Sequence, residues 1–227
     1  MAVCQIMDRK KFNQKLKETK IFVKNALQNS HSCHDYEHTI RVFNNAKMLL
    51  KFEKEADYQV VLIASLLHDI GRSNEFASSG NICHAQAGAE IAKKYLLENG
   101  FDGEFAEKTA QAIRVHRFRN KKNAPKTSEE KILYDADKLD SLGAVGIGRA
   151  FMFAAAVGAK LHNSKSAALR GREYSSDDTA YREYLVKFVR IPQKMQTRQG
   201  RIIAERELEF MKEFFDKLNI QSKGKIL

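Results

Sequence analysis

Proline and tryptophan are scarce in this sequence. Among its 227 residues there are two prolines and no tryptophan. Short strands joined by tight turns need frequent turn residues, so the lack of proline disfavours a β-sandwich or barrel and favours long helices. No segment shows the apolar–polar alternation of a half-buried strand. The sequence therefore predicts an all-α bundle of about eight to ten helices.

Cysteine is also rare, and the chain lacks a long hydrophobic run. The three cysteines, Cys4, Cys33 and Cys83, are odd in number and scattered, which argues against a disulfide framework and for a reducing compartment. The first residues show no apolar core of signal-peptide length. The most apolar run, residues 144–159, is short for a bilayer and is interrupted by Arg149. We therefore expect a cytoplasmic protein without a membrane span.

Charge of one sign is in excess: 39 lysines and arginines face 28 acidic residues, giving a net charge of +11. A basic surface concentrates anions, so phosphorylated molecules are the expected partners. Direct nucleic-acid binding is not favoured, because none of the usual nucleic-acid motifs is present. The sequence has neither a G-x-x-x-x-G-K-[ST] phosphate loop nor a G-x-S-x-G elbow, which disfavours kinase, ATP-motor and serine-hydrolase chemistry.

Two adjacent ionisable residues, His68 and Asp69, lie in the string LLHDIGR at residues 66–72. They end the most apolar predicted helix, YQVVLIASLLHDI, and Gly71 is placed as its left-handed C-terminal residue. Burying a carboxylate without compensation is expensive, and imidazole with carboxylate suits a divalent transition metal. A helix cap is the other interpretation of a lone His–Asp pair.

Further candidate ligands lie on both sides of this pair. Upstream, Asp35 is expected to cap a helix that places His38 in its first turn. Downstream, Asp137 and Asp140 are three residues apart and share a helix face. Asp137 follows an apolar turn that should draw it inward, where it too would favour a cation.

These blocks resemble the HD-domain superfamily of metal-dependent phosphohydrolases. The family pattern H…HD…D matches His38, His68–Asp69 and Asp137, within the strings HDYEHTIRV, LLHDIGR and DADKLDSLGAVGIGRAF. The resemblance implies an all-α HD fold in which these four residues bind metal. It also implies one domain, with an N-terminal helix over residues 1–30, a metal-binding core over 31–155, and a loop with C-terminal helices over 156–227.

Two further histidines, His84 and His116, stand in the order of the longer family pattern H…HD…H…H…D. In that pattern two metals are bridged by the aspartate of the HD pair. In one-metal relatives such histidines contact substrate or support the ligands, and the sequence leaves both interpretations open. A zinc site built on Cys33–His34 and Cys83–His84 is disfavoured, because the C-x₂₋₄-C spacing of structural zinc sites is absent.

The expected chemistry is attack of a metal-activated water on phosphorus. Nearby cations should stabilise the transition state, and Arg72 and Lys138 are the candidates. Asp140 could orient a ligand or accept a proton, and Glu75 is a weaker acid/base candidate. The basic residues expected to hold a polyphosphate are Arg117, Arg119, Lys121 and Lys122.

The sequence thus predicts a phosphohydrolase acting on a phosphate ester or anhydride, with a nucleotide as the expected substrate. It leaves open whether the enzyme is a pyrophosphohydrolase, nucleotidase or phosphodiesterase. It also leaves open one or two metals among manganese, magnesium, nickel, iron and zinc. The alternatives are a catalytically idle module that binds a nucleotide for regulation, and a basic nucleic-acid-binding protein. A homodimer through the apolar stripe of the last helix stays open as well.

Overall fold

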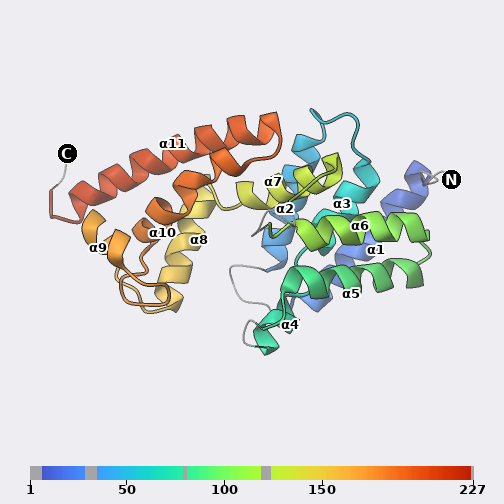
Figure 1. Ribbon diagram of the computed structural model, residues 1–227, viewed down its shortest axis with the longest axis horizontal. Helices are drawn as coiled ribbons and strands as arrows, with labels where there is room; N and C mark the ends of the chain where they lie inside the picture. The colour runs from blue at the N-terminus through green and yellow to red at the C-terminus, as the bar shows by residue number, and fades with distance from the viewer. Residues whose placement is uncertain (1–6, 29–34, 79–80, 119–123, 226–227) are drawn as a thin grey trace. The chain divides into compact units, whose positions relative to one another are not determined.

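The regular structure of this protein is helical throughout the part of the chain that is described. The computed structural model describes residues 7–28, 35–78, 81–118 and 124–225, and these ranges contain no strand (Figure 1). The prediction of an all-α protein is therefore confirmed. Within the same ranges no single helix is long and apolar enough to cross a membrane. Only the bent pair of α7 (Ser128–Leu139) and α8 (Gly143–Ala156) reaches that length and hydropathy.

The chain divides into two compact units, residues 1–137 and residues 138–227, and the division falls within the sequence of α7 (Ser128–Leu139). The first unit holds α1 (Arg9–Ala26), α2 (Tyr36–Leu49), α3 (Tyr58–Leu67), α4 (Arg72–Ala77), α5 (His84–Glu98) and α6 (Gly103–Val115). The second unit holds α8 (Gly143–Ala156), α9 (Lys165–Arg170), α10 (Ala180–Val186), η2 (Phe188–Arg190), η3 (Pro192–Lys194) and α11 (Arg198–Gln221). A single domain with divisions near residues 30 and 155 stays a prediction.

Helix α3 is the centre of the first unit. Every residue from Gln59 to Leu67 is buried, as expected for a helix that is apolar nearly all round. It packs against α1, α2 and α6, and α5 lies along α6 (Figure 1). Because α3 is enclosed on all sides, the residues that follow its last turn are also carried into the interior.

Side-chain caps begin the helices where the sequence predicts them. The carboxylates of Asp35, Asp57 and Asp102 accept hydrogen bonds from the first backbone amides of α2, α3 and α6. A capping box is also present: Glu130 N donates to Thr127 Oγ1, and Glu130 Oε2 accepts from Thr127 N, both at 3.3 Å. These caps fix where the helices that carry the site begin.

The predicted end of α3 is wrong in one respect. The helix ends at Leu67, and Gly71 is not among the glycines with positive φ. Gly71 instead permits a close approach of two backbones, because a Cβ on it would lie 2.3 Å from the His84 carbonyl oxygen and 2.5 Å from the Gly88 nitrogen. The turn after α3 is thereby held against the first turn of α5, and the short helix α4 follows it.

The second unit differs from expectation at residues 159–177, which the sequence predicts as an irregular surface loop or mobile flap. This segment contains α9, and its polar residues are joined by hydrogen bonds. Lys160 Nζ donates to Asp177 Oδ1 at 3.0 Å, and Asn163 Nδ2 donates to the Asp177 carbonyl at 3.1 Å. The predicted helix over 178–190 is α10 followed by η2, since the α-helix ends at Val186.

We predict that Gly71→Ala destabilises the protein by about 2–3 kcal/mol or more, because the added methyl group meets backbone atoms that cannot rotate away. Gly103→Ala is the matched control, since no atom lies within 4 Å of the position of its Cβ. That control should change the free energy of unfolding by less than about 1 kcal/mol. Denaturant unfolding of both variants measures the difference, and equal stabilities would contradict the assigned role of Gly71.

Candidate metal centre

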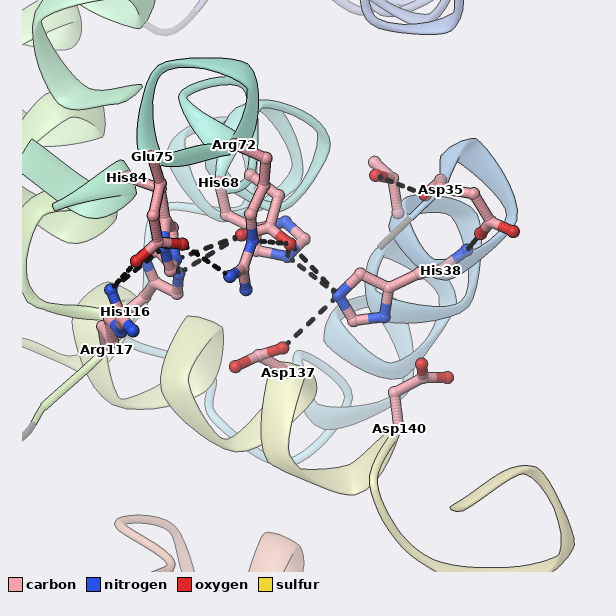
Figure 2. Close-up of polar contacts among 12 residues, drawn as sticks. Asp35, His38, His68, Arg72, Glu75, His84, His116, Arg117, Asp137 and Asp140 are labelled. Atoms are coloured by element: carbon pink, nitrogen blue, oxygen red, sulfur yellow. Dashed lines mark hydrogen bonds and ion pairs between the residues drawn. The ribbon is translucent and has the colours of Figure 1, made fainter. Parts of the chain in front are cut away.

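Six buried or nearly buried side chains of the first unit form two groups of ligand atoms. One group is His38, His68 and Asp137, and the other is Asp69, His84 and His116. Within each group the ligand atoms lie within 4.8 Å of one another, close enough to share one metal ion. In Figure 2, His38 and Asp137 face each other, and His84 and His116 lie on the far side of His68. The structure therefore brings together all six residues of the longer predicted pattern.

The Asp69 carboxylate joins the two groups. Its Oδ2 lies 3.6 Å from His38 Nε2 and 3.7 Å from His68 Nε2. Its Oδ1 lies 3.4 Å from His84 Nε2 and 3.7 Å from His116 Nε2. Each oxygen thus faces one pair of imidazoles, which is the arrangement of a carboxylate that bridges two metal positions.

Two of the histidines are oriented by the ends of the helices that carry them. His68 follows the last residue of α3 and His116 follows the last residue of α6, where backbone carbonyls have no partner inside the helix. The ring nitrogen Nδ1 of His68 lies 2.8 Å from the Ser65 carbonyl oxygen, and that of His116 lies 2.6 Å from the Ile113 oxygen. A carbonyl only accepts, so each Nδ1 carries the hydrogen and each Nε2 lone pair points into the site.

The ligands on α2 and α7 are brought together by a hydrogen bond between these helices. His38 lies in the first turn of α2, immediately after the cap by Asp35. Asn45, further along α2, donates its side-chain amide to the Ala136 carbonyl at 3.1 Å. This bond holds the turn that carries Asp137 against α2, and it leaves Asp137 Oδ1 3.5 Å from His38 Nε2.

His84, the first residue of α5, is oriented by a side chain instead of a carbonyl. Its Nδ1 lies 2.8 Å from Glu75 Oε2, and Glu75 also pairs with Arg117 through Oε1. Arg72 connects this group to the bridge: its Nε lies 3.0 Å from Asp69 Oδ2 and its Nη1 lies 3.1 Å from Glu75 Oε2 (Figure 2).

The imidazoles of His68 and His84 are in the form that binds metal. Burial lowers the pKa of His68 to about 4, although Asp69 partly offsets it, and lowers the pKa of His84 to about 3. Both rings are therefore neutral near pH 7, with Nε2 available as an electron-pair donor. For Glu75, burial raises the pKa, but contacts with His84 and Arg117 outweigh it and the net pKa lies below the usual value.

The donor set fits divalent metal. Neutral imidazole nitrogens and carboxylate oxygens are ligands for manganese, iron, nickel and zinc. The carboxylates of Asp69, Asp137 and Glu75 outnumber the guanidinium groups of Arg72 and Arg117. The side chains of the centre therefore carry a net negative charge. Cations at the two ligand groups would compensate the buried charge, so the residues present suit the metal ions that the sequence predicts.

The remaining predicted site residues are not among the six ligands. Lys138 and Asp140 belong to the second unit, where Asp140 Oδ2 pairs with Arg149 at 2.6 Å. Their catalytic roles stay predictions. The predicted phosphate-binding residues Arg119, Lys121 and Lys122, and Cys33 with His34 of the alternative zinc site, lie outside the described residues.

The sequence does not reveal the contacts of Glu75. Its position three residues after Arg72 indicates that the two share a helix face, and α4 confirms that spacing. The contact between Glu75 and His84 cannot be predicted from sequence periodicity, because the two residues belong to different helices, α4 and α5. Only the folded backbone brings their side chains together.

Comparison with known proteins identifies the family to which the chain is similar. The model of the HD domain matches residues 35–142, which include all six ligand residues. YpgQ of Bacillus subtilis (strain 168), an uncharacterized protein, is 31% identical over 206 residues, covering 88% of this chain and 90% of YpgQ. The chain belongs to the HD-domain family.

Solved structures agree with this assignment. A crystal structure of Bacillus subtilis YpgQ in complex with ADP is 28% identical, with a TM-score of 0.70, and covers 91% of this HD-domain protein and 94% of YpgQ. A predicted HD superfamily hydrolase from an uncultured Thermotogales bacterium is 30% identical, with a TM-score of 0.66, and covers 95% and 99% of the two chains. The family is that of metal-dependent hydrolases, so the general class of the predicted activity is supported.

We predict that Asp69→Ala removes most bound metal while the helical content stays, because the substitution deletes the only carboxylate that faces both ligand groups among the described residues. His84→Ala should lose about one metal equivalent of two. Elemental analysis after dialysis, with circular dichroism, measures both. The exposed Glu104→Ala serves as control. Full metal content in Asp69→Ala would exclude this site.

We also predict that the chelator-treated protein loses stability as the pH falls from 7 to 5. The folded protein keeps His68 and His84 neutral, because their pKa values are about 4 and about 3. The unfolded chain takes up protons near the ordinary value of 6.5, so acid favours unfolding. Thermal unfolding at pH 7, 6 and 5 measures this trend, and His84→Gln should show a smaller loss. A melting temperature that is constant over this range would contradict the prediction.

Proposed function

We propose that this HD-domain protein is a phosphohydrolase with two divalent metal positions, and that its substrate is a nucleotide. The observation that carries the proposal is the placement of Asp69, which presents one oxygen to His38 and His68 and the other to His84 and His116. Metals bound at such a pair of positions supply an activated water and polarise a phosphoryl oxygen.

The protein's own residues prepare the site for an anionic substrate. The guanidinium of Arg72 lies beside Asp69 at the edge of the centre, with 22% of its side chain exposed. Its positive charge can offset negative charge that develops on phosphoryl oxygens in the transition state. Asp137 is also partly exposed, at 14% of its side chain.

The proposal of a nucleotide rests on charge and on a relative. The chain carries a net charge of +11, which favours association with multiply charged anions. A relative that aligns over most of its length, Bacillus subtilis YpgQ, has been crystallised with ADP. A nucleoside di- or triphosphate is the substrate class that agrees with both, and the predicted basic residues after His116 would bind its phosphates.

The proposal also includes the cellular location, the partners and the metal of this protein. The protein would act in the cytoplasm, with no membrane association. Homodimer formation stays a prediction, as does nucleic-acid binding, which the sequence does not favour. Manganese is the metal to test first, because imidazole and carboxylate donors accept it readily.

The test is turnover on a panel of nucleoside mono-, di- and triphosphates. Chelator-treated protein would receive manganese, magnesium, nickel or zinc, and phosphate and pyrophosphate would be measured separately. We expect metal-dependent release of one of these products, whose identity distinguishes nucleotidase from pyrophosphohydrolase action, and an activity at least about 100-fold lower in Asp69→Ala. Metal binding without turnover of any nucleotide would contradict the proposal and favour the idle regulatory module.

A further inference from the structure

Glu75 contacts three functional side chains at once. Its Oε2 lies 2.8 Å from His84 Nδ1 and 3.1 Å from Arg72 Nη1, and its Oε1 pairs with Arg117 Nη1. Only 18% of the Glu75 side chain is exposed. Glu75 therefore lies one step outside the ligand groups: it contacts the second group directly at His84, and Arg72 links it to Asp69.

The contact with Glu75 determines which nitrogen of His84 carries the hydrogen. A carboxylate oxygen 2.8 Å from a ring nitrogen is stable only if that nitrogen donates, because two lone pairs at this distance repel. Arg117 Nη1 is also near, 3.3 Å from His84 Nδ1, but a guanidinium is always a donor and Glu75 accepts from it as well. His84 therefore carries its hydrogen on Nδ1, and the Nε2 lone pair points toward Asp69 Oδ1 and His116.

The orientation of His84 differs from that of the other two oriented histidines. His68 and His116 donate to carbonyls of their own helices, which are fixed by the helix backbone. His84 begins a helix, where the backbone offers free amides and no free carbonyl, so its Nδ1–H needs an acceptor from elsewhere. Glu75, which belongs to α4, supplies that acceptor.

The two arginines hold Glu75 in place. Arg72 comes from α4 itself and Arg117 follows the end of α6, so the carboxylate is fixed from two elements. A charge-assisted contact is stronger and more directional than a neutral one. This arrangement gives Arg117 a structural partner inside the protein, in addition to the substrate contact that the sequence predicts for it.

We propose that Glu75, braced by Arg72 and Arg117, is the positioning residue of the second metal position. Glu75 orients His84 so that Nε2 faces the Asp69 carboxylate. The His38–His68–Asp137 position does not depend on Glu75 for its geometry. The inference rests on the two-metal centre of the proposed function. It assigns a selective role, since loss of Glu75 weakens one metal position and spares the other.

The test is a calorimetric titration of Mn²⁺ into chelator-treated wild type, Glu75→Ala and Glu75→Gln. Wild type should bind two equivalents. In Glu75→Ala one equivalent should keep its affinity and the other should weaken about 10- to 100-fold, as for loss of a hydrogen-bond partner of a ligating histidine. Glu75→Gln, whose amide oxygen can still accept from His84 Nδ1–H, should weaken the second equivalent by less than about tenfold.

Glu90→Ala is the matched control, because Glu90 of α5 also pairs with an arginine, Arg114 at 2.9 Å, but on the exposed surface away from the site. It should bind both equivalents as wild type does. Thermal unfolding of each metal-free variant shows whether it folds, and Glu75→Gln keeps the test valid if Glu75→Ala does not.

Three results would overturn the inference. Unchanged binding of both equivalents in Glu75→Ala would show that His84 needs no support from Glu75. Equal weakening of both equivalents would make Glu75 a general support of the fold. A single equivalent in wild type would remove the second position itself, and with it the two-metal form of the proposed function, so this failure is distinguishable from the first two.

Discussion

The arrangement of the site depends on one buried carboxylate. Asp69 is 1% exposed and lies in the turn after α3, the helix that the rest of the first unit encloses. Its negative charge at this depth requires compensation, and Arg72, whose Nε lies 3.0 Å from Asp69 Oδ2, supplies part of it. The imidazoles of His68 and His84, one in each ligand group, are neutral near pH 7, so they supply donor atoms without charge. A carboxylate held in this way is suited to binding cations. The four helices α2, α5, α6 and α7 contribute the ligands that surround it.

Helix ends provide most of the ligand geometry. His68 and His116 follow the C-terminal ends of α3 and α6, where carbonyls of the last helical turn orient their rings. His38 and His84 lie in the first turns of α2 and α5, where no such carbonyl is free. The centre therefore forms where two helices end and two begin, and the helix starts need outside support. The cap by Asp35 fixes the backbone at His38, and Glu75 fixes the ring of His84.

Close backbone packing makes this convergence possible. The turn that carries the HD pair lies against the start of α5, and only a glycine at position 71 leaves room for the His84 carbonyl. The same contact brings His84 to Asp69 and brings α4, with Glu75, to His84. The junction between α3, α4 and α5 thus places Asp69, His84 and Glu75 together, while α2, α6 and α7 contribute the other ligands. The match to the HD domain includes all six ligand residues.

The sequence by itself determined the all-helical class, the caps of α2, α3 and α6, and the residue types of the ligand pattern, because these follow from local periodicity and short motifs. It left open whether His84 and His116 belong with the other ligands, and it gave Glu75 no more than a minor role. Only the tertiary structure decided these points. Asp69 and His116 are far apart along the chain, and their separation across the site depends on how α3 and α6 pack, which no local pattern encodes. The end of α3 and the conformation of Gly71 were likewise set by contact with α5, where packing outweighed the usual preference of a helix terminus.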